Sequence, residues 1–302
     1  MVVQYLGVAV VAGMLVGTPA PAAQPHRIAC VRAGSIYVLS GATATRLTRD
    51  ADDTRPRWSP DGRRIAYGHA GRLWVINADG TGAVPVATGQ VGGADWSSDG
   101  RWLAFTAPGC TGTPGVFRVS ATGGIPQALF PASCRGSAPL AAAPRHGASG
   151  SLPARLRADG SVAWSPDGTR IAFPGGDCLA VADDCLTVGD VASGTEQAVA
   201  VYGGGGEILS GFAVVPAWRP DGQRLSWTAA REGEAVHVVE ADPPGTRARS
   251  VGVPLDREMV YDGTGRGVLT AQYRGGSWII AVDLATGART PLVQGSQPSV
   301  ER

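Results

Sequence analysis

Polar residues that could bind a ligand lie in a few short stretches of this chain. Most are carboxylates, accompanied by two arginines and a histidine: Asp50, Asp52, Asp53, Arg135, Arg145, His146, Asp177, Asp183, Asp184 and Glu207. Clustered carboxylate oxygens are the ligands that Ca²⁺ prefers. However, no Asp-x-Asp-x-Asp-Gly loop is present, and aspartate is a common turn residue. We therefore expect solvated loop carboxylates and no cofactor, with a Ca²⁺ site as the alternative.

The histidines form no local catalytic motif. They are His26, His69, His146 and His237. None belongs to a His-Glu-x-x-His pair, no Gly-x-Ser-x-Gly elbow occurs, and the Lys of a phosphate-binding loop is missing. His146 and the arginines near it could contact an anionic ligand, but a solvated loop is the simpler interpretation. The sequence therefore identifies no catalytic residue.

A repeated motif predicts the elements that position these residues. Trp58 begins a Trp-Ser-Pro-Asp-Gly sequence, which recurs with small variations at Trp96, Trp164 and Trp218 and in reduced form at Tyr261. The spacings between these aromatic residues are 38, 68, 54 and 43 residues. Ser-Pro-Asp-Gly suits a tight turn, since Pro favours the second position and Gly the last. Each unit thus predicts one strand ending at the aromatic residue, a turn and a second strand.

Two more apolar segments follow within each unit, so we expect four antiparallel strands per unit. Residues 73–76, 102–105 and 279–282 are apolar on both faces of the predicted strand. A sheet with one wet face would instead alternate between apolar and polar residues. Antiparallel sheets with two dry faces pack against one another, as the blades of a propeller do, and the repeated aromatic residue would fill the space between blades.

The two ends of the chain complete the count of blades. Residues 28–32, 35–40 and 45–48 supply only three strands, whereas residues 297–300 resemble residues 55–58, with Val300 in the place of Trp58. The C-terminal strand therefore completes the first blade and removes the exposed sheet edges of an open ring. We predict an all-β, six-bladed β-propeller with four antiparallel strands per blade over residues 28–302.

The repeat resembles that of TolB-like propellers, whose signature is an aromatic residue, Ser-Pro-Asp-Gly, a basic residue and an apolar strand. The resemblance covers residues 28–302 and includes the segments 46–48 and 73–80. It implies a six-bladed fold. Such propellers occur as periplasmic partners of the Tol envelope system, in lipoproteins and as gating domains of prolyl-oligopeptidase-like peptidases. We find neither the helical domain that precedes the propeller in TolB nor a hydrolase domain in this sequence.

The long insertions fall on one side of the predicted ring. With the strands of a blade named A to D from the centre outwards, residues 131–160 and 203–215 are D–A loops and residues 174–185 are a B–C loop. Loops of these two kinds share one face of a propeller, which we call the loop face. Because loops on a rigid scaffold commonly carry binding residues, the loop face is the candidate binding surface.

The cysteines support this arrangement. Cys110 and Cys134 lie in loops of one blade, and Cys178 and Cys185 flank a six-residue interval within one loop. Two local disulfides, Cys110–Cys134 and Cys178–Cys185, would hold the insertions, since Cys-x6-Cys without a nearby histidine is a poor zinc pattern. Cys30 would remain as an unpaired buried thiol.

The N-terminal sequence predicts export. Residues 6–17 are apolar and are followed by Ala20-Pro21-Ala22, as in a signal peptide covering residues 1–22. An uncleaved N-terminal anchor is the alternative, and this segment would be the only contact with a membrane. The five cysteines suit an extracellular, periplasmic or envelope location. The net charge of +1 argues against nucleic-acid binding.

Taken together, these features favour a monomeric, exported, non-catalytic propeller that binds a protein or a cell-envelope glycan through the loop face. An enzyme of the lyase or lactonase type is the first alternative. Its site would lie at the mouth of the central channel, where residues of different blades meet without forming a local motif. A membrane-tethered structural or sensory module is the second alternative.

Overall fold

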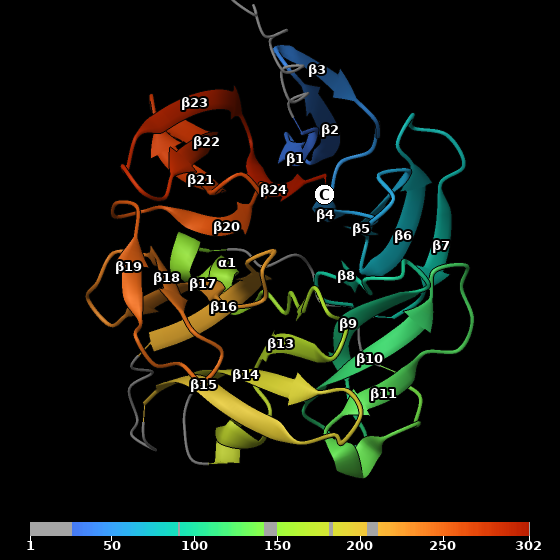
Figure 1. The fold of residues 1–302 in the computed structure, drawn as a ribbon. Helices are drawn as coiled ribbons and strands as arrows, with labels where there is room; N and C mark the ends of the chain where they lie inside the picture. The colour runs from blue at the N-terminus through green and yellow to red at the C-terminus, as the bar shows by residue number, and fades with distance from the viewer. Residues whose placement is uncertain (1–25, 90, 142–149, 181–183, 204–210, 302) are drawn as a thin grey trace, which may run out of the picture.

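Figure 1 shows a computed structural model of the chain, which describes residues 26–89, 91–141, 150–180, 184–203 and 211–301. Six four-stranded antiparallel sheets surround a common centre. This arrangement confirms the all-β, six-bladed propeller that the repeats predict. The signal-peptide prediction falls on residues 1–22, which lie outside the described residues.

We number the blades 1 to 6 along the chain. Blade 1 contains β1 (Ile28–Arg32), β2 (Ser35–Ser40), β3 (Thr43–Arg46) and β24 (Ser296–Val300). Blade 2 contains β4 (Asp53–Trp58), β5 (Arg64–His69), β6 (Arg72–Asn77) and β7 (Val84–Ala87). Blade 3 contains β8 (Asp95–Trp96), β9 (Trp102–Pro108), β10 (Pro114–Ser120) and β11 (Gln127–Phe130).

The second half of the ring has the same organisation. Blade 4 contains β12 (Ala163–Trp164), β13 (Arg170–Pro174), β14 (Asp184–Asp190) and β15 (Glu196–Tyr202). Blade 5 contains β16 (Gly211–Trp218), β17 (Leu225–Arg231), β18 (His237–Ala241) and β19 (Arg249–Val251). Blade 6 contains β20 (Arg257–Tyr261), β21 (Arg266–Tyr273), β22 (Gly276–Asp283) and β23 (Arg289–Gln294). The described residues also include α1 (Leu152–Arg157), η1 (Ala132–Cys134) and η2 (Asp177–Ala180).

The ring closes as the sequence predicts. Strand β24 pairs with β1, placing Val300 opposite Ile28 in the innermost position of blade 1. Val300 is buried, and the following Glu301 accepts a hydrogen bond from the Arg27 Nε at 2.8 Å. The first and last strands of the propeller therefore belong to one sheet.

Two predicted boundaries were wrong. The third strand covers Thr43–Arg46 and not residues 45–48, because the Thr48 hydroxyl leaves the strand and accepts a hydrogen bond from the Ile36 amide. The insertion that we predicted over residues 203–215 ends before Gly211. Residues 211–215 instead begin β16, where they are buried and pair with β17.

The repeated turn is held together by its own side chains. The Ser59 hydroxyl donates to the Asp61 carboxylate at 2.6 Å and accepts from the Arg64 amide at 2.9 Å. Gly62 has a φ of +66°, a left-handed conformation that residues with a Cβ rarely adopt. The same hydroxyl-to-carboxylate bond occurs in the turns after Trp96 and Trp164, at 2.6 Å in both.

The motif aromatics fill the space between blades. Trp96 is 1% exposed and packs in one cluster with Leu73 and Val75 of the preceding blade. The guanidinium of Arg64, from blade 2, lies 4.8 Å from the centre of the Trp96 ring. Arg170 and Trp218 repeat this contact between blades 4 and 5 at 4.7 Å. An arginine at the start of strand B thus covers the tryptophan of the next blade, where it adds a cation–π interaction.

We searched the described residues for a membrane-spanning helix. None of their helices combines the length and the apolar character that crossing a bilayer requires.

Candidate functional site

The innermost strands carry a repeated distortion that turns selected side chains towards the channel. Arg55 in β4, Val215 in β16, Glu258 in β20 and Gln297 in β24 each lie three residues before the motif position. Their φ angles are 50°, 53°, 58° and 57°, and the strand pairing shifts register beside them. A bulge at one position of several blades therefore redirects the chain at the same level of the channel.

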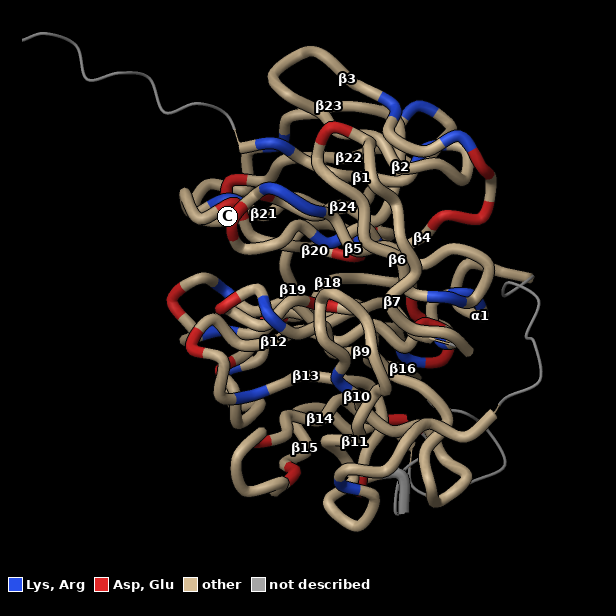
Figure 2. Tube along the Cα trace, turned by 90° about the vertical axis from the view of Figure 1, so that its right-hand side faces the viewer, with Lys and Arg blue, Asp and Glu red and all other residues tan. Residues whose placement is uncertain are grey.

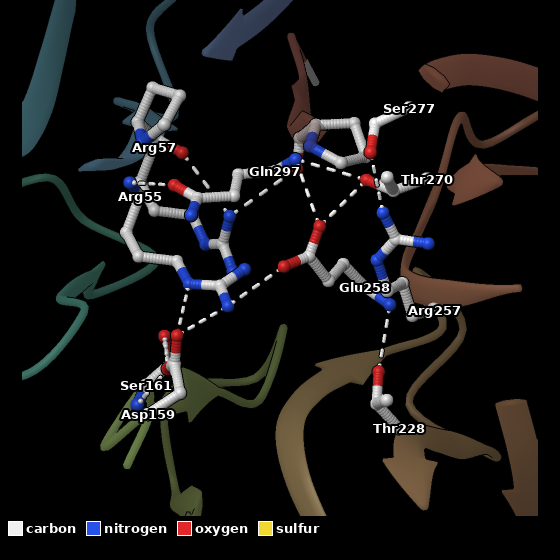
Figure 3. Close-up of polar contacts among 12 residues, drawn as sticks. Arg55, Arg57, Asp159, Ser161, Thr228, Arg257, Glu258, Thr270, Ser277 and Gln297 are labelled. Atoms are coloured by element: carbon white, nitrogen blue, oxygen red, sulfur yellow. Dashed lines mark hydrogen bonds and ion pairs between the residues drawn. The ribbon is translucent and has the colours of Figure 1, made fainter. Parts of the chain in front are cut away.

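Charged residues from separate blades meet at this level (Figure 3). The Arg55 Nε donates to the Asp159 carboxylate at 2.5 Å, and its Nη2 lies 2.9 Å from a Glu258 carboxylate oxygen. The second Glu258 oxygen accepts from the Thr270 hydroxyl at 2.7 Å and from the Gln297 amide at 3.0 Å. The Gln297 side-chain oxygen accepts from the Arg55 amide at 2.7 Å. We call Arg55, Asp159, Glu258 and Gln297 the channel network.

The three ionisable side chains of the channel network are largely buried. The side chains of Arg55, Asp159 and Glu258 are 5%, 13% and 6% exposed. Burial disfavours the charged guanidinium, but Asp159 and Glu258 outweigh burial and raise the pKa of Arg55. Burial likewise disfavours the charged form of Glu258, but Arg55 and Arg257 lower its pKa overall. Removing one partner would leave the others charged in a poorly solvated place.

Asp159 reaches the channel through the long connection between blades 3 and 4. We call residues 150–162 the cap segment. Its helix α1 begins at Ser151, whose hydroxyl accepts a hydrogen bond from the Ala154 amide, and Pro153 occupies the first turn. These are ordinary start signals of a helix.

The cap segment is attached to three blades before it enters blade 4. Leu156 is buried against Phe212 and Val215 of blade 5. Asp159 pairs with Arg55 of blade 2, and the Val162 amide donates to the Gly93 carbonyl of blade 3 at 3.0 Å. Figures 1 and 2 place α1 beside β16, on the side of the ring away from the chain's C-terminal end. The cap segment therefore lies across the loop-side end of the channel.

The first predicted acidic group divides into exposed and buried members. Asp50 and Asp52 are exposed, whereas Asp53 is 2% exposed at the start of β4. An Asp53 oxygen lies 2.8 Å from the His69 Nδ1, and the Thr48 hydroxyl donates to the other oxygen. Burial raises the pKa of Asp53 despite these two partners.

His69 was missed by sequence reasoning, although cross-strand pairing brings it opposite Asp53. Its imidazole is 27% exposed, and the contact with Asp53 orients the ring. Within the described part of the chain, His69 has no other hydrogen-bond partner. This pair could have been predicted from the sequence by extending the antiparallel pairing of β4 and β5 away from their turn, which places residue 53 opposite residue 69.

The second predicted group lies in blade 4, away from the first. Asp177 is exposed in η2, and Asp184 is partly buried at the start of β14. Arg135 donates to the carbonyls of Val191 and Ala192 in the C–D turn of blade 4, so its guanidinium joins two blades. The remaining candidates, Arg145, His146, Asp183 and Glu207, lie outside the described residues.

The two predicted disulfides are present in the structure. Cys110 pairs with Cys134, joining the B–C loop of blade 3 to η1, and Cys178 pairs with Cys185 in blade 4. Cys30 is free and 1% exposed in β1, where burial raises the pKa of its thiol to about 11. No group of three or more His, Cys, Asp or Glu residues suitable for a metal ion occurs among the described residues.

Asp184 gives the loop face a pH-dependent contribution to stability. Burial raises its pKa from 3.8 to about 6, and Arg157 of α1 acts in the opposite direction. The folded state therefore holds an extra proton between these two values, and the contribution of Asp184 to stability falls as the pH rises through that window. We expect Asp184→Asn to raise the melting temperature at pH 7.5 by roughly 2–4 °C and to have little effect near pH 4. Thermal unfolding at both values measures this.

Asp61 provides a control, because its pKa is shifted in the opposite direction to that of Asp184. The Ser59 hydroxyl lowers its pKa, so its charged form favours folding above the unfolded-state pKa and this contribution disappears in acid. Asp61→Asn should therefore lower the melting temperature at pH 7.5. Equal shifts of Asp184→Asn at both pH values would contradict the proposed titration of Asp184.

Comparisons with known proteins support the fold. No known family model matches the sequence, and no curated protein does. A putative TolB from Agrobacterium tumefaciens matches with a TM-score of 0.60 and 18% identity, over 91% of this chain and 92% of that one. TolB from Acinetobacter baumannii matches with a TM-score of 0.68 and 15% identity, over 91% of this chain and 66% of that one.

A third solved structure, of a nidogen/laminin complex, has a TM-score of 0.62 and 10% identity, over 92% of this chain and 98% of the matched chain. These identities are low, so the likeness concerns the fold. The fold is thus shared with two TolB structures and with one chain of the nidogen/laminin complex.

Proposed function

We propose that this chain is an exported propeller that binds a protein partner on its loop face, with the cap segment at the centre of the contact. The observation that carries the proposal is the attachment of residues 150–162 to β4, to Gly93 in the loop before β8 and to β16, across the end of the channel. The cap segment closes that end and presents the exposed residues Pro153, Ala154 and Arg155.

The attachments of the cap segment suit a preformed binding surface. The ion pair of Asp159 and the burial of Leu156 fix it at two points, and the Cys110–Cys134 disulfide fixes the start of the same connection. A loop that is already ordered loses less conformational entropy when a partner binds. The long connection can therefore support a stable contact despite its length.

Export has separate support. Two disulfides are stable in oxidising compartments outside the cytosol, and the N-terminal sequence resembles a signal peptide. The fold shared with TolB structures and with a component of the nidogen/laminin complex agrees with a role in binding proteins.

Charge reversal on the cap tests the proposal. Arg155 is exposed on α1, so Arg155→Glu should preserve the fold and reduce capture of a protein partner from envelope extract by roughly tenfold. The matched control is Arg63→Glu, an exposed arginine in the A–B turn of blade 2, on the opposite face. Quantitative mass spectrometry of the captured proteins compares the two variants with the unmodified chain.

The capture experiment distinguishes specific binding through the cap segment from nonspecific capture. Loss of one captured protein with Arg155→Glu alone supports binding through the cap segment. Equal loss with both variants would indicate nonspecific electrostatic capture. Recovery of a cell-wall glycan in place of a protein would contradict the choice of partner, and no saturable capture at all would contradict the proposed function.

A further inference from the structure

Arg57 is a buried cation in the channel that the channel network does not neutralise. It lies in β4 one residue before Trp58 and is 8% exposed. Figure 3 shows its guanidinium beside that of Arg55, near the centre of the close-up. One nitrogen, Nη1, donates to the carbonyls of Pro56 and Pro298 at the long distances of 3.2 and 3.4 Å. Its Nε and Nη2 donate to no described residue.

The carboxylates near Arg57 form ion pairs and hydrogen bonds with other residues. Asp159 and Glu258 bind Arg55, and their remaining oxygens accept from Ser161, Thr270 and the Gln297 amide. Asp95, at the equivalent position of β8, attracts Arg57, but one of its oxygens accepts from the Trp164 amide at 2.8 Å. None of the described carboxylates forms an ion pair with Arg57 within 4.0 Å.

Arg57 is therefore a buried charge without a direct ion-pair partner among the described residues. Burial lowers the pKa of Arg57, and the attraction of Asp95, Asp159 and Glu258 only partly offsets this effect, while Arg55 adds repulsion. A buried charge without a close partner is strongly unfavourable, whereas an arginine with free donors binds carboxylate and phosphate oxygens well. At the equivalent positions of blades 1, 4 and 5 the residues are Ser299, Ala163 and Ala217. Their side chains are small, so Arg57 has a longer side chain than the equivalent residues of these three blades.

We propose that the channel binds a small oxyanion, a carboxylate or a phosphate group, at the Nε and Nη2 of Arg57. The site is separate from the protein-binding surface proposed on the cap segment, because it depends on β4 inside the channel. Asp95, Asp159 and Glu258 attract Arg57 without forming an ion pair with it, so the ligand must be a compact anion that lies directly against the guanidinium.

Calorimetric titration of the whole chain tests this site, with sodium phosphate and sodium acetate as probes at constant ionic strength. We expect one saturable site, weakened at least about tenfold in Arg57→Met. The control is Arg64→Met, which removes an arginine that lies over Trp96 outside the channel and should leave the titration unchanged. Saturation by acetate alone would assign a carboxylate ligand, and saturation by phosphate alone would assign a phosphate group; either supports the site.

Thermal unfolding without either anion provides an independent readout. Because Arg57 is a buried charge without a direct ion-pair partner, Arg57→Met should be at least as stable as the unmodified chain, whereas the anion should raise the melting temperature only when Arg57 is present. A large loss of stability in Arg57→Met would show that the protein already satisfies the guanidinium and would overturn the proposal. So would the absence of saturable binding, or equal binding by Arg57→Met.

Discussion

Replacing Arg55 by methionine is expected to lower the free energy of unfolding by about 3–5 kcal/mol. The guanidinium pairs with Asp159 and Glu258, both largely buried, so its removal leaves both carboxylates without the cation that forms their direct ion pair. Methionine keeps an unbranched side chain at a position with a φ of 50°, which limits added backbone strain. Urea denaturation followed by tryptophan fluorescence measures the loss.

Two further variants make this expectation specific to the buried charge. Arg101→Met removes an exposed ion pair with Asp99, whose side chains are 78% and 42% exposed, and should change stability by less than about 1 kcal/mol. The triple variant Arg55→Met, Asp159→Asn, Glu258→Gln should recover most of the lost stability, since neither of the two carboxylate charges remains. If the triple variant is no more stable than Arg55→Met, the loss does not arise from uncompensated carboxylates.

Ending the chain at Gly295 is expected to abolish the cooperative unfolding transition. The truncation removes β24, which supplies the innermost strand of blade 1, and leaves the edge of β1 unpaired. It also removes Gln297, whose side chain and amide link Arg55 to Glu258. An open ring with an exposed strand edge should associate, so size-exclusion chromatography and near-ultraviolet circular dichroism measure the effect.

The matched control ends at Glu301 and keeps β24 together with the Arg27–Glu301 ion pair. It should elute and unfold as the full chain does. A truncated chain that remains monomeric with an unchanged melting temperature would show that closure by β24 contributes little to stability.

Local interactions explain why the sequence was informative about the blades. In the three turns that contain a serine, its hydroxyl bonds a carboxylate two residues later and an amide five residues later, as Ser59 does with Asp61 and Arg64. Such contacts can be read from spacing alone. The strand order and the closure by β24 followed from counting repeats, because blades with two dry faces have few ways to arrange themselves around a ring.

The errors also have local explanations. Residues 211–215 follow a glycine-rich segment, which favours a loop, but their apolar side chains are buried beneath α1 in β16. Residues 45–48 have the composition of a strand, but Thr48 uses its hydroxyl to bond Ile36 and Asp53. In both cases a contact made by a distant segment or a side chain decided where the strand begins or ends.

The repeat, the fold, the ring closure and the two disulfides could all be predicted from the amino-acid sequence, since each depends on spacing within a blade or between chain ends. The residues that meet in the channel could be identified only once the blades were placed in space. Arg55 and Asp159 are 104 residues apart in the sequence. Glu258 and Gln297 come from two other blades, so no local sequence pattern predicts that these four residues pair. A propeller brings the equivalent residue of every inner strand to its centre. The charge and burial of each such residue therefore depend on the side chains that the other five blades place there.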